Sequence, residues 1–322
     1  MVSYAFTPLT VNVFFAFNAL SDYSYGKRNR SKLIVIMTNK DLATLRNEID
    51  RIDNTIHDLL MERAEVVENV RAAKGADGIK LRPGREAEIL RRLIARHTGP
   101  FPKGALVRIW REVMSAYLKL QGRLAMAVYM PEPGAVFWDL ARDQYGSQTP
   151  MTSHASVRGV ISAVQSGEAA IGVLPVPTYS DSDPWWRHIY STAENTPQIL
   201  SRLPVAQTEK VRGTYEEALI IGLPSDDHTD NERYYTALEF NAEISPRTII
   251  STFADCGLDV VVQGQWHHET VRDQWLFLIE ADVVISQDHE AIKKFLEKTD
   301  AHVTGLQKLG GYAVPFSAEE LA

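Results

Sequence analysis

Between Leu42 and Ala73 the apolar residues recur at alternating steps of three and four, the heptad pattern of a helix that packs against another helix. No glycine or proline interrupts the pattern before Gly75, so we expect one helix of more than thirty residues, long enough to indicate packing against a partner. The segment 38–41 resembles a capping box with Asp in place of Glu and predicts the helix start. The seam consists of Leu42, Leu45, Ile49, Ile52, Ile56, Leu59, Arg63, Val66, Val70 and Ala73.

Two shorter helical patterns follow, at residues 85–97 and 103–123. After Leu124 strand-like and helical runs alternate, which is typical of an α/β fold. In this part we expect strands at 125–129, 169–174 and 218–223, and helices at 135–145 and 156–166. The last part predicts helix 247–256, strand 260–265, strand 276–281, helix 289–298 and a final strand near Gly305.

These changes of pattern divide the chain into four parts. The apolar run from Val11 to Leu20 is too short to span a bilayer, and its basic cluster follows it instead of preceding it. We therefore expect a disordered extension here, with a targeting peptide as the alternative. The predicted parts are the extension 1–37, an all-helical domain 38–124, an α/β domain 125–240 and an α+β domain 245–316.

Composition and charge narrow the classes of function. Cys256 is the only cysteine, which excludes an internal disulfide and fits a reducing, cytoplasmic setting. The net charge of −7 is uneven, because residues 38–124 carry +5 and residues 125–322 carry −15. The basic residues of the helical domain alternate with acids, so a small polyanion is favoured over nucleic acid as its ligand.

Motifs for other chemistries are missing from the sequence. It contains no P-loop, no Gly-x-Gly-x-x-Gly and no Gly-x-Ser-x-Gly. The adjacent pair His267 and His268 points to opposite faces of a strand, which argues against a shared metal. Trp185 and Trp186 are interpreted as a packed loop anchor, with a ligand lid as the alternative. We expect no metal, no cofactor and no membrane partner.

Arg63 is the informative exception in the seam, at a position where Leu or Ile is expected. A guanidinium on an apolar stripe is costly unless an anion meets it, although its stem can also snorkel towards solvent. Arg46 and Lys74 lie beside the same seam. At 1.5 Å per residue they are roughly 42 Å apart on one straight helix. A small ligand that meets both must therefore take Arg46 from a second, antiparallel copy.

At these residues the helical domain resembles a known family, that of the all-helical chorismate mutases. The match covers about a quarter of the chain, and the resemblance implies an intertwined helical homodimer whose two sites are each completed by the partner's arginine. The matching residues are Leu45-Arg46-x-x-Ile49-Asp50-x-Ile52-Asp53, Leu59-Leu60-x-Glu62-Arg63, Lys74, Arg85-Glu86 and Gln121.

The resemblance also assigns roles to these residues in the rearrangement of chorismate to prephenate. Arg46 and Arg63 would grip the two carboxylates, with Arg85 in support. Lys74 and Gln121 would donate to the ether oxygen, and Glu86 would accept from the ring hydroxyl. The expected catalytic residues are thus Arg63, Lys74, Glu86 and Gln121, and Arg46 and Arg85 complete the substrate-binding set.

Two positions depart from the family pattern. Arg82 stands where an acid is often found, which affects the ring-hydroxyl contact. Tyr117 stands where a small hydroxyl residue is often found, which affects one carboxylate contact. Neither position belongs to the charged core of the predicted site.

The α/β domain resembles prephenate dehydratase, a periplasmic-binding-like fold, through residues 128–134 and 163–175. The family's Glu-Asn-Ser motif is replaced by Pro177-Thr178-Tyr179, and its Thr-Arg-Phe motif by Glu216-Glu217-Ala218. An acid cannot grip a carboxylate as arginine does, so we expect this domain to have lost dehydratase chemistry.

The last domain resembles a ferredoxin-like ACT regulatory domain, including the ending Leu309-Gly-Gly-Tyr-Ala-Val-Pro315. The segment that marks phenylalanine-sensing versions is absent, and residues 263–267 stand in its place. A small-molecule effector is expected, with its identity open.

The sequence therefore predicts a chorismate mutase, an isomerase of phenylalanine and tyrosine biosynthesis. Two alternatives are a bifunctional mutase/prephenate dehydratase and a non-catalytic sensor of an aromatic metabolite.

Overall fold

The computed structural model describes residues 41–74, 81–122, 124–132, 136–207, 216–224, 232–268, 274–299 and 302–322. It separates into two compact units, Met1–Glu62 and Arg63–Ala322. The expected extension 1–37 lies outside the described residues.

The long helix predicted from the heptad seam is α2, which runs from Leu42 to Lys74 over 33 residues. Asp41 caps it, because its carboxylate accepts the backbone N–H of Ala43 at 3.3 Å. Thr38, the first residue of the expected capping box, lies outside the described residues. The seam of α2 is exposed within one chain, from 39% at Leu45 to 69% at Leu42. An exposed apolar stripe of this kind is typical of helices that pack against another helix.

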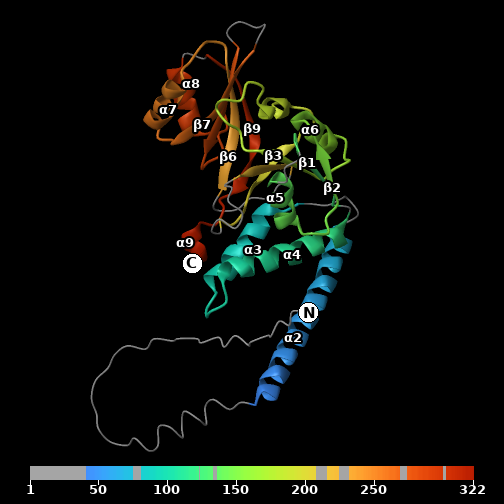
Figure 1. Ribbon diagram of the computed structural model, residues 1–322. Coiled ribbons are helices and arrows are strands. Elements are labelled where there is room, and N and C mark those ends of the chain that lie inside the picture. Colours follow the sequence, from blue (N-terminus) through green and yellow to red (C-terminus); the bar gives the residue numbers. More distant parts are fainter. Residues whose placement is uncertain are drawn as a thin grey trace, which may run out of the picture. The chain divides into compact units, whose positions relative to one another are not determined.

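Two further helices, α3 (Pro83–Ala95) and α4 (Lys103–Gln121), follow α2. The first begins two residues earlier than expected, because proline is well tolerated in the first turn, where its missing N–H costs nothing. The two helices lie next to each other (Figure 1) and pack through a small buried cluster. Its buried members are Leu90, Val107, Met114 and Phe316.

The α/β part forms one end of a nine-stranded sheet with the order β2-β1-β3-β5-β4-β9-β6-β8-β7. The strands β1 and β2 are parallel, as are β1 and β3, whereas β5 is antiparallel to both β3 and β4. Its elements are β1 (Met126–Tyr129), α5 (Val136–Tyr145), β2 (Met151–His154), α6 (Val157–Gln165), β3 (Ile171–Pro175), η1 (Trp185–Ile189), β4 (Gln198–Leu203) and β5 (Ala218–Gly222).

The alternation of side chains along the strands gives this sheet two buried faces. On one face Met126, Val128 and Ile171 pack with Ala141 and Tyr145 of α5. On the other face Ala127 and Leu219 belong to a cluster with α6 and the short helix η1. Strands that are buried on both faces are expected to be apolar throughout, which is why the sequence pattern revealed β1, β3 and β5.

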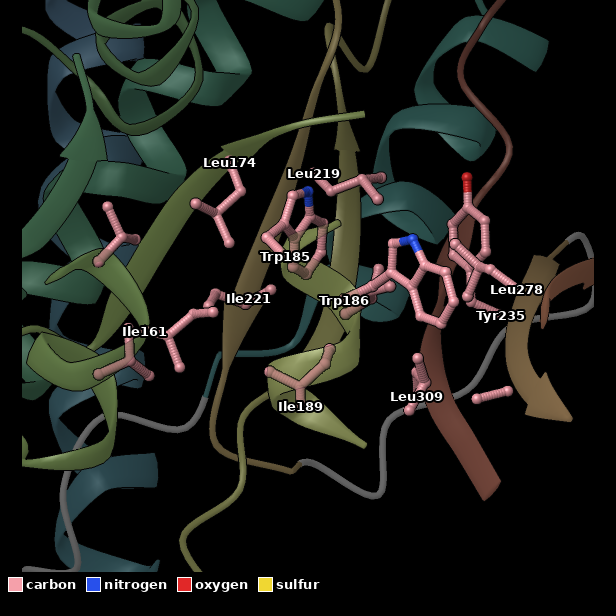
Figure 2. Close-up of a cluster of buried hydrophobic side chains, with 14 of the residues drawn as sticks. Ile161, Leu174, Trp185, Trp186, Ile189, Leu219, Ile221, Tyr235, Leu278 and Leu309 are labelled. Carbon is pink, nitrogen blue, oxygen red and sulfur yellow. The ribbon is translucent and has the colours of Figure 1, made fainter. Parts of the chain in front are cut away.

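The tryptophan pair of η1 is deeply buried. Trp185 is 2% exposed and Trp186 is 0% exposed, and both belong to the cluster drawn in Figure 2. Trp185 Nε1 donates to the Pro175 carbonyl at 2.9 Å, which fixes η1 beneath the end of β3. The interpretation of the pair as a packed loop anchor is confirmed.

The last part is a β-α-β-β-α-β unit whose strands have the order β9-β6-β8-β7, with antiparallel neighbours throughout. It begins with β6, so this unit starts before residue 245, and β6 was not foreseen as its first strand. Both helices cover one face of its sheet (Figure 1). Its elements are β6 (Glu232–Phe240), α7 (Pro246–Asp255), β7 (Val260–His267), β8 (Trp275–Ala281), α8 (Glu290–Lys298) and β9 (Val303–Ala313).

The α/β part and the β-α-β-β-α-β unit join edge to edge through β4 and β9, where Ile199 pairs with Gly310. Gly310 has a φ of 128°, and a Cβ there would overlap the backbone of Ile199. Only glycine allows the two strands to approach this closely.

The residues after β9 return to the helical part. Phe316 is 4% exposed and packs among side chains of α3 and α4. The short helix α9 (Ala318–Leu321) follows, and Lys103 Nζ donates to the Ala322 oxygen at 2.8 Å. These contacts connect the end of the β-α-β-β-α-β unit directly to α3 and α4.

Candidate active site

Arg63, the exceptional residue of the seam, is half-buried in the structure. Its guanidinium carbon lies 4.3 Å from the centre of the Tyr117 ring, within cation–π distance. Its Nη1 atom is buried and has no hydrogen-bond partner among the described residues. A buried guanidinium donor left without an acceptor is costly, and an anionic ligand would satisfy it. Arg63 therefore has the environment expected of an anion-binding residue.

Tyr117 departs from the family pattern, and the structure gives it a role. Its side chain is 8% exposed and its ring provides the surface on which Arg63 lies. A small hydroxyl residue at this position would leave the guanidinium without that support. The tyrosine ring thus provides a surface for the neighbouring cation.

Glu86 of α3 is held by a residue that the sequence did not single out. Arg111 Nη1 of α4 donates to Glu86 Oε2 at 2.6 Å, and the two side chains are 4% and 13% exposed. The other guanidinium nitrogens of Arg111, Nε and Nη2, donate to the Gln144 carbonyl of α5 at 3.2 and 3.1 Å. Arg111 gave no signal in the sequence, because one more arginine on a basic helix is usually a solvated one.

A tyrosine lies beside this ion pair. The Tyr145 hydroxyl is fully buried, and burial together with the nearby negative charge of Glu86 raises its pKa far above the ordinary value. The guanidinium carbon of Arg111 lies 5.9 Å from the centre of its ring. Tyr145 therefore stays neutral and contributes an aromatic wall to the pair.

Arg85 and Arg82 lie at the solvent-exposed start of α3. Arg85 Nη1 donates to Glu88 Oε2 at 2.8 Å, and both side chains are about half exposed. Arg82 is the N-cap residue of α3, and its carbonyl accepts the backbone N–H of Glu86 at 3.0 Å. Arg82 thus helps to place Glu86 through its backbone.

Gln121 is the last residue of α4 and is half-buried. The preceding residue fixes this end of the helix, because Arg71 Nη1 of α2 donates to the Leu120 carbonyl at 2.9 Å. The Lys74 side chain lies outside the described residues. Arg46 is exposed and belongs to the other compact unit.

The helix α4 is thus the common support of the described site residues. It carries Gln121, the platform for Arg63 and the ion-pair partner of Glu86. Within the described ranges, no group of three or more His, Cys, Asp or Glu side chains is placed to hold a metal ion. No helix among the described residues is both long and apolar enough to cross a membrane.

The positions that replace the dehydratase motifs are engaged in local contacts. Thr178 Oγ1 donates to Asp181 Oδ1 at 2.6 Å. Glu217 accepts hydrogen bonds from Arg202 Nε at 3.1 Å and from Arg202 Nη2 at 2.7 Å, which makes a bidentate ion pair. Arg202 Nη1 also donates to the Tyr312 hydroxyl of β9 at 2.9 Å. Glu217 is thus held by Arg202 within the domain.

Comparison with known proteins places the helical part in a family. Residues 45–122 match the family model of chorismate mutase type II. This range contains the Arg46-to-Gln121 pattern, so the resemblance seen in the sequence is confirmed, and the chain carries a chorismate mutase type II domain.

The relatives with similar sequences are named for two activities. The chain is 33% identical over 142 residues to the bifunctional chorismate mutase/prephenate dehydratase of Aquifex aeolicus, and 32% identical over 141 residues to that of Stutzerimonas stutzeri. Each alignment covers 42% of this chain, and 39% and 38% of the respective relatives. The matched part is therefore about two fifths of those proteins.

Prephenate dehydratases are among the solved structures that align with this chain. The prephenate dehydratase of Streptococcus mutans aligns with 60% of this chain and 99% of its own, at 17% identity and a TM-score of 0.43. The prephenate dehydratase of Arthrobacter aurescens aligns with 61% and 93%, at 10% identity and a TM-score of 0.42.

Proposed function

We propose that the protein is a chorismate mutase that rearranges chorismate to prephenate without a cofactor, in aromatic amino acid biosynthesis in the cytoplasm. The observation that carries this proposal is Arg63, an arginine on an apolar helix face with a buried Nη1 donor that lacks a partner among the described residues. Chorismate is a dicarboxylate, and the planar guanidinium grips a carboxylate through two parallel hydrogen bonds.

The reaction explains why the other residue types are needed. The rearrangement breaks a C–O bond and forms a C–C bond in one step, with no nucleophile and no net proton transfer. Catalysis must therefore come from holding a compact substrate conformer and from donors aimed at the ether oxygen, where negative charge develops. Lys74 and Gln121 are proposed as these donors, and Glu86 as the acceptor of the ring hydroxyl. Arg85 is proposed to support the carboxylate end.

A homodimer completes the proposed site. The seam of α2 is 39–69% exposed from Leu42 to Leu59, and a second copy of the helix would bury it. Arg46 and Lys74 are roughly 42 Å apart along one straight helix, so both reach one small ligand only if they come from different protomers. The exposed seam and this separation support the same assembly, an antiparallel pair of α2 helices.

The remaining parts are proposed to support and regulate the mutase. The α/β part is proposed to be a dehydratase-like domain that has lost its activity, because Glu217 is paired with Arg202 where the motif requires a free arginine. The β-α-β-β-α-β order of β6 to β9 supports an ACT-like regulatory domain for a small-molecule effector. We place its first residue near Glu232.

A paired assay of the purified protein tests these proposals. We expect chorismate to disappear, followed by its ultraviolet absorbance, and prephenate to accumulate without conversion to phenylpyruvate. Persistent chorismate absorbance would reject the enzyme and leave the non-catalytic sensor. Formation of phenylpyruvate from added prephenate would instead establish the bifunctional alternative that the names of the relatives suggest.

A further inference from the structure

Among the described residues, Arg111 is the most deeply buried charged side chain that contacts a residue of the proposed site. It is 3% exposed, and its donors reach oxygen acceptors on two other helices, while Nη1 also lies 3.9 Å from Met114 Sδ of its own helix. Nη1 reaches Glu86 Oε2 of α3 at 2.6 Å, whereas Nε and Nη2 share the Gln144 carbonyl of α5 at 3.2 and 3.1 Å. One edge of the planar group is thus fixed by backbone, and the remaining edge faces Glu86.

A purely structural role explains this arrangement poorly. Burying an ion pair between helices is expensive, and apolar side chains of similar size usually pack such a contact at least as well. The ion pair does fix the orientation of Glu86. The guanidinium is held by the Gln144 backbone carbonyl, so it cannot rotate and it determines where Glu86 Oε2 lies. A carboxylate has about four lone-pair sites, so the bond from Arg111 leaves Glu86 Oε1 able to accept from a ligand.

We propose that Arg111 is a positioning residue for the mutase reaction, which orients Glu86 from behind while α5 fixes Arg111 through the Gln144 carbonyl. The inference rests on the proposed function of Glu86. It makes α5, the first helix of the α/β part, a structural component of the mutase site. The activity of the mutase helices then depends on the dehydratase-like domain, which follows them in the same chain.

The test is a double-mutant cycle in the full-length protein. Arg111→Gln, Glu86→Gln and the double variant are compared with the wild type by kcat/KM for chorismate, with circular dichroism and Tm as checks of the fold. Displacing a catalytic group by about 1 Å costs about 100-fold, and we expect a loss of this order for Arg111→Gln. In the Glu86→Gln background the same change should cost less than about threefold, because Arg111 then has no carboxylate to orient.

Arg108→Gln is the matched control. Arg108 is on the same helix and also contacts α5, where its Nη2 lies 3.7 Å from Asp143 Oδ1, but both side chains are largely exposed. We expect near-wild-type kcat/KM for this variant. Arg111→Lys is measured as well, because it keeps the charge but cannot hold both acceptors at once, and a loss of at least about tenfold is expected. It replaces Arg111→Gln in the cycle if that variant does not fold.

The outcomes separate this inference from the function on which it rests. A wild-type protein that leaves chorismate unchanged contradicts the proposed function. An active wild type whose folded Arg111 variants retain near-normal kcat/KM contradicts the positioning role. Losses that multiply in the double variant also contradict it, because they would show that Arg111 acts independently of Glu86.

Discussion

At the scale of a single residue, Arg63 could be identified from the sequence, whereas its contacts required the structure. The sequence identifies it because a charge interrupts an apolar seam, and the helix period then places its neighbours. The ring of Tyr117 beneath the guanidinium belongs to α4, 54 positions later in the chain, so it depends on the tertiary packing. The role of Arg111 was out of reach for the same reason. Its two oxygen acceptors are on other helices, and no local sequence pattern predicts how these helices approach α4.

Replacement of Arg63 tests the proposed carboxylate grip. We expect Arg63→Ala to lower kcat/KM by at least about a hundredfold, because a desolvated charge pair with the substrate is lost. Arg63→Lys should recover only part of this loss, since an ammonium lacks the planar fork. Steady-state kinetics with chorismate provide the measurement.

Arg92→Ala serves as the control for this replacement, because Arg92 is an exposed residue in the last turn of α3. It should leave kcat/KM and Tm near their wild-type values. An Arg63→Ala protein that is folded and turns over at the wild-type rate would place the carboxylate contact elsewhere.

Secondary-structure elements were predictable where one local signal dominated. The helices α2, α4, α5, α6, α7 and α8 begin and end within a few residues of their expected bounds, because apolar periodicity and capping residues such as Ser156 and Ser245 mark them. The strands β2, β4 and β6 were missed. Their sequences mix polar and apolar residues, and neighbouring strands decide their conformation.

At the scale of secondary-structure elements, replacement of Gly310 tests the pairing between β4 and β9. Gly310→Ala combines a φ of 128° with an overlap against the backbone of Ile199, which cannot move aside as a side chain can. We expect the free energy of unfolding to fall by about 3 kcal/mol or more. Denaturant unfolding followed by tryptophan fluorescence measures the change.

Gly257→Ala isolates the contribution of backbone conformation from that of close contact. Gly257 has a φ of 83°, but a Cβ there would meet nothing within 4 Å. Its replacement should cost only about 1–2 kcal/mol. Equal losses for the two variants would contradict the claim that the close approach of Ile199 demands glycine.

At the scale of the whole molecule, the contacts between parts were the least predictable feature. The sequence patterns separated helical, α/β and α+β parts, but they did not reveal the shared nine-stranded sheet or the return of Phe316 to the α3–α4 cluster. The net charge of −15 over residues 125–322 gave no indication of these contacts either. Such contacts depend on shape complementarity between surfaces distant in sequence, and hydrophobic periodicity carries no information about it.

The exposed seam of α2 leads to the central claim, a mutase site shared between two protomers. Arg46→Ala and Arg63→Ala damage the same site from different chains if the assembly is antiparallel. In a mixed dimer of these two variants, one site carries both changes and the other carries neither. Random mixing makes half of the dimers mixed, so about one quarter of the wild-type activity should return.

The decisive measurement is therefore the rate of chorismate consumption by the two variants, each alone and after co-expression. We predict almost no activity for either variant alone and about one quarter of the wild-type rate for the mixture. Mixed dimers that form, as shown by differently tagged chains that co-purify, but recover no activity would contradict a shared site.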